Sequence, residues 1–227
     1  MDIVLIAGLW LDESVWARVA AHLAECGHRP VPVALPGQGD GNPSATLADQ
    51  VAAVLAAVDS AAGRPMVVGH SAASSLAWLA VDARPGKVAK TAFIGGWPAP
   101  DGTPYFDGLP VKDGAVPFPG WDEFEGPDSA DLDDAARRAF AAAAIPVPEG
   151  VTSAVVRLAD LRRYDVPAVL ICPEFTPDQV RELISQGELP ELAKIRNLSL
   201  VDIDSGHWPM ITAPAELAGL IDQAAAT

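Results

Sequence analysis

Short aliphatic runs alternate with amphipathic segments along most of the chain. A continuous run of β-branched and aliphatic residues predicts a strand covered on both faces, and apolar positions three and four apart predict a helix. The expected strands span residues 2–7, 31–35, 66–68, 91–94, 167–172 and 198–203. The expected helices span residues 12–26, 46–60, the alanine-rich stretch up to 83, 178–185 and 214–225. This alternation predicts a mostly parallel sheet of about six strands, with right-handed crossovers and helices on both faces.

The pattern lapses between residues 97 and 165. This segment is rich in proline, glycine, acidic and aromatic residues, and it carries one expected helix near residues 132–144. The strand pattern resumes at residue 167, which favours an inserted cap or lid within a single domain of residues 1–227. A set of purely structural loops is the alternative.

One serine follows the third expected strand directly. Gly69-His70-Ser71-Ala72-Ala73 lies between that strand and the helix after it. The stretch is close to the G-x-S-x-G nucleophile elbow, in which a strained turn exposes a serine hydroxyl above a parallel sheet. Ala73 replaces the second glycine. The alternative for Ser71 is a purely structural role as a small residue in a tight turn.

Further polar groups fall where other strands end. Gly8-Leu9-Trp10 follows the first strand, Glu174 the fifth and His207 the sixth. Ligands bind at the carboxyl ends of the strands in open parallel sheets. The chain order serine, acid, histidine is the order of the α/β-hydrolase triad, in which the histidine acts as base and the acid orients it. A loop histidine that caps a carbonyl is the alternative for His207.

At these positions the chain resembles the α/β-hydrolase superfamily. It is most similar to the small methylesterase and hydroxynitrile-lyase-like group, which includes the plant salicylate-binding esterases. The stretches that carry the resemblance are residues 7–9, 26–31, 34–37, 67–72, 93–100 and 205–209. The resemblance implies an α/β-hydrolase fold with one inserted lid. It also implies Ser71 as nucleophile, His207 as base, and the backbone N–H groups of Leu9 and Ala72 as the oxyanion hole.

The acid departs from the pattern of this group. The group typically has aspartate at the position that Phe175 occupies here. Glu174 is adjacent, and its extra methylene group could compensate for the displacement. Asp178, near the start of a helix, and Asp101, after the fourth strand, are the other candidates. Glu174 is the first choice.

Net charge and cysteine content indicate which classes of partner and which cellular location to expect. The net charge is −15 and the pI is about 4.4, which disfavours nucleic acid and an anionic membrane surface. No apolar run is long enough to span a bilayer, and no leader precedes the first strand. Cys26 and Cys172 have neither metal-ligand spacing nor a disulfide pattern. We therefore expect a cytoplasmic protein without metal or cofactor. The acids at positions 128, 131, 133 and 134 are interpreted as a cluster at a helix start.

Aromatic residues indicate the type of substrate. Trp10, Trp97 and Trp208 each follow a strand beside a candidate catalytic residue, and an apolar pocket suits an uncharged ester or lactone. The nearest arginine pair, residues 162–163, precedes a strand and should lie at the opposite end of the sheet. The sequence thus predicts a serine hydrolase acting on a small hydrophobic or aromatic metabolite. The alternatives are a lyase or cyclase that uses the same site, and a ligand-binding protein on a degenerate hydrolase fold. The oligomeric state is left open.

Overall fold

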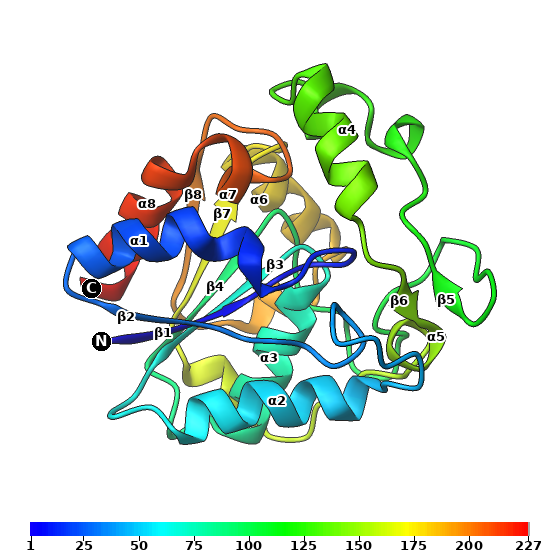
Figure 1. Ribbon diagram of the computed structural model, residues 1–227. Helices are drawn as coiled ribbons and strands as arrows, with labels where there is room; N and C mark the ends of the chain where they lie inside the picture. Colours follow the sequence, from blue (N-terminus) through cyan, green and yellow to red (C-terminus); the bar gives the residue numbers. More distant parts are fainter. Residues whose placement is uncertain (227) are drawn as a thin grey trace.

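The central feature of the computed structural model, which describes residues 1–226, is a six-stranded sheet (Figure 1). The strand order is β2-β1-β3-β4-β7-β8, and its strand pairs are parallel. The strands of this sheet are β1 (Asp2–Ile6), β2 (Arg29–Pro32), β3 (Met66–His70), β4 (Lys90–Ile94), β7 (Ala168–Cys172) and β8 (Leu198–Asp202). The predicted α/β class and parallel sheet are confirmed.

Helices cover both faces of the sheet. The main helices are α1 (Ala17–Glu25), α2 (Leu47–Asp59), α3 (Ala73–Ala83), α4 (Asp134–Ala143), α6 (Pro177–Gln186) and α8 (Pro214–Ala226). Helices α1 and α8 pack side by side on one face, and α2 and α3 lie together on the other (Figure 1). Each face has its own buried core, because the strand side chains alternate between the two faces. Within residues 1–226, no helix combines the length and the hydropathy needed to cross a membrane.

The second strand was placed too far along the chain from the sequence. The expected range was 31–35, but β2 pairs with β1 from Arg29 to Pro32. The N–H of Arg29 donates to the carbonyl of Met1, directly before β1, and that of Val33 to Leu5 of β1, whereas Pro30 and Pro32 lie at the alternate positions. Because β2 is an edge strand, those positions need no N–H donor, and proline is tolerated there.

The segment between β4 and β7, residues 97–165 and named the inserted segment from here on, lies at one end of the sheet. It contains α4, the short antiparallel pair β5 (Ala115–Val116) and β6 (Val147–Pro148), and the single turn α5 (Glu149–Thr152). In Figure 1 α4 stands apart from the helices that flank the sheet, whereas α5 packs against α2. Helix α4 begins two residues later than expected, because Asp133 caps it through a bond from Ala136 N–H. The assignment of residues 97–165 as a lid of a single domain stays a prediction.

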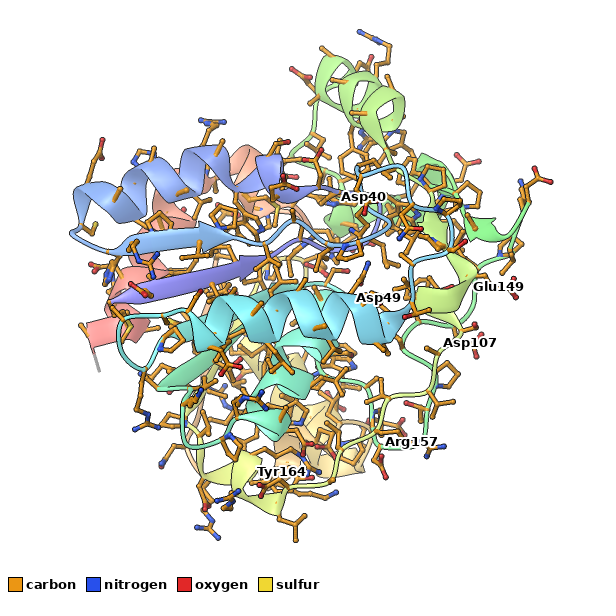
Figure 2. All side chains as sticks on the ribbon, turned by 60° about the horizontal axis from the view of Figure 1, so that its bottom comes forward. Asp40, Asp49, Asp107, Glu149, Arg157 and Tyr164 are labelled. Carbon is orange, nitrogen blue, oxygen red and sulfur yellow. The ribbon has the colours of Figure 1, made fainter. Side chains whose placement is uncertain are left out.

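A buried polar network closes the amino end of the sheet. Arg163 pairs with Asp82 at 3.1 Å and with Glu191 at 3.2 Å, and Tyr164 donates to Glu191. Arg163 and Tyr164 belong to a short 3₁₀ helix directly before β7, so the predicted position of this arginine pair is correct. Tyr164 is labelled in Figure 2. The network ties α3 to the loops around β7, and its members satisfy one another's polar atoms, which buried charges require.

Gly69 is required where β3 meets α3. A Cβ atom at this position would lie 2.3 Å from the carbonyl oxygen of Ala73 and 2.9 Å from the nitrogen of Ser74. Gly69→Ala is expected to lower the free energy of unfolding by ~2–4 kcal/mol, because backbone atoms of a helix cannot give way as a side chain does. Urea denaturation measures the effect. Gly63→Ala is the matched control, since no atom lies within 4 Å of a Cβ there. An equal free energy of unfolding for the two variants would contradict the lack of space for a Cβ atom at Gly69.

Candidate active site

Ser71 lies where the strand order reverses. The chain passes from β1 to β2 at one side and returns to the other side of β1 with β3, and ligands bind at such a switch point in open parallel sheets. Ser71 follows β3 with φ of 55°, and its N–H donates to the carbonyl of Ile94 at 2.7 Å. Ala73 is buried as the first residue of α3. The elbow therefore forms with alanine, rather than glycine, at its fifth position.

Three predicted site residues form one hydrogen-bonded chain. His207 Nε2 lies 2.9 Å from Ser71 Oγ, and His207 Nδ1 lies 2.6 Å from Glu174 Oε1. The side chains of His207 and Glu174 are 13% and 12% exposed. This geometry orients the imidazole with Nδ1–H toward the carboxylate and its free Nε2 toward the serine, as base catalysis at Ser71 requires.

The three candidate acids have different partners in the structure, and only one of them contacts His207. Glu174 contacts His207, whereas the Asp101 carboxylate accepts from Leu158 N–H and Asp178 pairs with Arg181 on α6. The ring of Phe175 packs against Trp97 with centroids 5.5 Å apart. The position at which the related group has aspartate thus faces the inserted segment, and the longer glutamate one residue earlier reaches the histidine.

His70 binds the backbone of the loop that carries His207, a role that the sequence did not reveal. Its ring is buried, and Nε2 lies 2.7 Å from the backbone oxygen of His207. Burial, followed by the nearby charge of His207, lowers the pKa of His70 to about 3. The ring is therefore neutral, and Nε2 carries the proton because a carbonyl only accepts. A polar residue at a fully buried strand end was the available signal, since such a group requires a partner.

His70 should make the protein less stable in mild acid. The unfolded chain binds a proton at His70 near pH 6.5, but the folded chain does so only near pH 3. Between these values the unfolded state holds one more proton, so the free energy of unfolding falls by up to ~1.4 kcal/mol per pH unit as the pH drops. Urea denaturation between pH 7 and 4.5 should show a shallower decline for His70→Gln, which keeps a donor. His22→Gln, at a partly exposed histidine on α1, is the control. Equal slopes for wild type and His70→Gln would refute this.

The loop after β1 brings backbone donors to the serine. A Cβ atom on Gly8 would lie 3.2 Å from the Cβ atom of Ser71. Among the described residues, no protein oxygen accepts from the N–H groups of Leu9 and Ala72. Buried Gln38 fixes this loop by donating to the carbonyls of Gly8 at 2.9 Å and Leu11 at 2.6 Å. An oxyanion needs N–H donors of this kind. The assignment of Leu9 and Ala72 to the oxyanion hole stays a prediction.

The comparisons with known proteins agree with this geometry. The model of the alpha/beta hydrolase family matches residues 3–220. The chain belongs to the alpha/beta hydrolase family. A search of curated protein sequences gives no match.

Solved structures similar to this hydrolase span the whole fold. An extracellular alpha/beta-hydrolase from a Paenibacillus species, described as homologous to tobacco salicylic acid binding protein 2, aligns with a TM-score of 0.78 at 19% identity over 99% of this chain and 98% of that one. The methylesterase MES16 from Arabidopsis aligns at 0.78 and 15% identity, over 100% and 99%. A pyrethroid hydrolase from Sphingobium faniae aligns at 0.75 and 19%, over 100% and 98%. At these identities the likeness shows the fold, and the resemblance to this group is confirmed.

Aromatic rings of the hydrolase surround His207 on the side of the inserted segment. Phe124 lies 6.2 Å from the His207 ring at an interplanar angle of 28°. Trp208 is buried against His207 and Phe124, and Trp10 packs edge-on against Phe124. Trp97 is 37% exposed. The structure thus places Trp10 and Trp208 in an aromatic wall beside the histidine, and their role toward a substrate stays a prediction.

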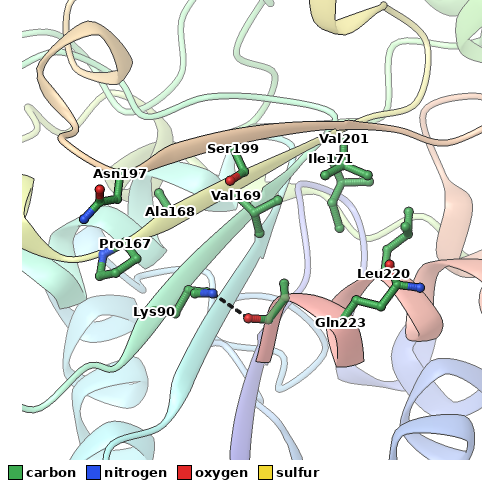
Figure 3. Close-up of a pocket in the computed structure, with 11 residues that line it drawn as sticks. Lys90, Pro167, Ala168, Val169, Ile171, Asn197, Ser199, Val201, Leu220 and Gln223 are labelled. Atoms are coloured by element: carbon green, nitrogen blue, oxygen red, sulfur yellow. Dashed lines mark hydrogen bonds between the residues drawn. The ribbon is translucent and has the colours of Figure 1, made fainter. Parts of the chain in front are cut away.

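Two cavities lie beside the sheet, and neither is lined by Ser71, Glu174 or His207. A cavity of about 390 Å³ runs along β7 and β8 next to α8, where Lys90 donates to the carbonyl of Ala224 (Figure 3). A second cavity of about 300 Å³ lies between Trp10, Val15 and the α4 residues Ala136 and Phe140, with mostly apolar walls.

Acidic groups occur around the inserted segment. Asp107 and Glu149 of that segment and Asp49 in the first turn of α2 lie toward the same side of the molecule in Figure 2. Together with the net charge of −15, they disfavour an anionic substrate. Within residues 1–226, no cluster of three or more histidine, cysteine or acidic side chains is placed to hold a metal ion.

The interpretation of the acidic cluster at positions 128–134 needs correction. Asp133 and Asp134 do begin α4. Asp131 instead accepts bonds from the loop that carries His207, at 2.8 Å from Gly206 N–H and 3.1 Å from Ser205 Oγ. The helix-start interpretation failed for Asp131, because the distant loop that carries His207 folds against it and donates to its carboxylate.

Proposed function

We propose that this protein is a serine hydrolase that cleaves a carboxylic ester or lactone of a small hydrophobic or aromatic metabolite. The observation that supports this most directly is the chain of two hydrogen bonds from Glu174 through His207 to Ser71, at 2.6 and 2.9 Å. The proposed roles are nucleophile for Ser71, base for His207 and orienting acid for Glu174.

The proposed reaction proceeds in two halves. His207 Nε2 takes the Ser71 proton while Ser71 Oγ attacks the substrate carbonyl, and the negative oxygen is held by the N–H groups of Leu9 and Ala72. His207 then gives the proton to the leaving alcohol oxygen, and the ester bond breaks. Water enters, loses a proton to His207 and attacks the acyl-enzyme. The acid leaves and Ser71 recovers its proton. Glu174 stabilises the positive imidazolium in both halves.

The aromatic wall supports an uncharged, hydrophobic substrate. Phe124 is half-buried and lies beside the His207 ring, with the buried rings of Trp10 and Trp208 packed against it. We propose that the more exposed Trp97 adds ring surface at the outer edge. Aromatic surface with few polar groups is typical of pockets for hydrophobic ligands. A structural neighbour described as a methylesterase and another described as a pyrethroid hydrolase support hydrolysis of a carboxylic ester.

A non-hydrolytic lyase or cyclase reaction at the same site is the second candidate. The observation that favours it is the similarity to tomato methylketone synthase I, with a TM-score of 0.76 at 16% identity over 99% of this chain and 97% of that one. Such a reaction would use Ser71 and His207 as proton-transfer groups without an acyl-enzyme.

Fluorophosphonate labelling and ester hydrolysis separate these functions. The purified protein should hydrolyse p-nitrophenyl esters from acetate to octanoate, with a burst of one p-nitrophenol per chain if deacylation is slow. A fluorophosphonate should add one adduct, located at Ser71 by peptide mass spectrometry. Heat-denatured protein is the control. No adduct and no hydrolysis of any ester would overturn the proposal.

The cytoplasmic location also remains part of the proposal. The structure has both cysteines free, with Cys172 buried and Cys26 exposed. Burial raises the pKa of the Cys172 thiol to about 12, so it is a poor nucleophile. One structural neighbour is described as extracellular, so fractionation of the native host is the direct test of location.

A further inference from the structure

The loop that carries His207 is held by the inserted segment as well as by the sheet. Asp131 lies in that segment, just before α4, and its Oδ2 accepts from Gly206 N–H at 2.8 Å and Ser205 Oγ at 3.1 Å. We infer that Asp131 is a positioning residue, through which the inserted segment sets the orientation of His207. This inference rests on the proposed function of His207 as the base.

Both backbone polar groups of His207 are bonded, each to a different part of the fold. Its N–H donates to the carbonyl of Asp128 at 2.8 Å, and its carbonyl accepts from His70 at 2.7 Å. The first bond comes from the inserted segment and the second from the elbow strand. Asp131 adds two bonds directly before His207. Hydrogen bonds to a carboxylate are stronger than neutral ones, so Asp131 is the strongest side-chain link between the segment and the loop.

Gly206 permits this close contact. A Cβ atom at Gly206 would lie 2.4 Å from Asp131 Oδ1 and 2.5 Å from the carbonyl oxygen of Asp128. Any larger residue would push the segment away from the loop. A glycine directly before His207 thus serves the contact with the inserted segment.

The inserted segment has other contacts with the loop that carries His207, so it should stay in place when the Asp131 carboxylate is removed. The segment is also attached by a cluster of rings, in which Trp121, Phe124 and Phe140 pack against Trp208. The Asp128 bond uses a main-chain oxygen and survives any side-chain change at Asp131. Loss of the Asp131 carboxylate should therefore loosen the loop around His207 while the fold persists.

The kinetic test compares two substitutions at Asp131 with a matched control. Asp131→Ala is expected to lower kcat by ~10–100-fold with KM within about twofold, because small displacements of a catalytic group cost rates of this order. Asp131→Asn keeps one acceptor oxygen and should lose less. Asp133→Ala removes the cap of α4 in the same segment, and should lower Tm while leaving kcat within about twofold of wild type.

A mutant cycle with Glu174→Gln tests whether Asp131 acts through the imidazole. Once Glu174 no longer holds the ring, adding Asp131→Ala should cost less than about threefold, because coupled residues are not additive. Full additivity of the two effects, or a rise in KM with kcat unchanged, would overturn the positioning role. So would unchanged kcat in Asp131→Ala.

A spectroscopic readout separates this inference from the proposed function. The Nδ1–H proton of His207, bonded to Glu174, should give a far-downfield proton NMR signal that is absent in His207→Ala. Asp131→Ala should broaden or abolish this signal, and Asp133→Ala should preserve it. If the wild type hydrolyses nothing and the signal still depends on Asp131, the proposed function fails and the positioning role holds. If esters are hydrolysed and the signal is unaffected in Asp131→Ala, the positioning role is wrong.

Discussion

Ser71→Ala is expected to lower kcat for p-nitrophenyl ester hydrolysis by ~10⁶-fold, to the background set by binding alone. The reason is that the hydroxyl of Ser71 is the group to which His207 Nε2 points, at 2.9 Å. Without it, no acyl-enzyme forms and no burst occurs. Stopped-flow and steady-state assays with the same ester series measure the loss, and the fluorophosphonate adduct should vanish in parallel.

Ser74→Ala is the matched control for this variant. Ser74 is buried on α3 one turn after the elbow, and its hydroxyl donates only a long bond, of 3.4 Å, to the carbonyl of Gly69. Its activity should stay within about twofold of wild type. If Ser71→Ala keeps its activity while its Tm matches that of wild type, hydrolysis through an acyl-enzyme at Ser71 is wrong. If labelling of Ser71 persists without any ester turnover, the lyase or cyclase function gains support.

Glu174→Gln is expected to lower kcat by ~10³–10⁴-fold with little change in KM, the second largest effect. Glutamine keeps the size and a hydrogen-bonding group at 2.6 Å from His207 Nδ1, but it has no charge to stabilise the imidazolium. It can also present its NH₂ group, which would favour the wrong imidazole tautomer. Steady-state kinetics with circular dichroism as a folding check measure the effect.

The two other candidate acids provide the controls. Asp178→Asn should be near wild type, because that carboxylate is 91% exposed and paired with Arg181. Asp101→Asn should affect stability alone, since Asp101 accepts from Leu158 N–H in the inserted segment. The double variant Glu174→Ala/Phe175→Asp should not recover activity, because the side chain at 175 is directed toward Trp97. Recovery of more than about tenfold over Glu174→Ala would contradict the orientation of this loop.

Much of the architecture follows from local patterns. The aliphatic runs predicted every strand of the parallel sheet, and only β2 was displaced, from the expected 31–35 to Arg29–Pro32. Ser71 and His207 were found because each follows a strand whose carboxyl end meets the same edge of the sheet. Glu174, Asp178 and Asp101 could only be ranked, because the direction of a side chain in a loop depends on what packs against the loop. His70 and Asp131 were missed as positioning residues for the same reason.

The sequence by itself determined the α/β order, the elbow at Ser71 and the histidine after the last strand, because short-range hydrophobic periodicity and turn chemistry are local properties. The tertiary structure decided which carboxylate meets His207 and what holds His207 in place. Glu174 Oε1, the His70 ring and the Asp131 carboxylate reach one loop from three separate parts of the chain. Those contacts depend on how distant segments pack, and no local pattern encodes them.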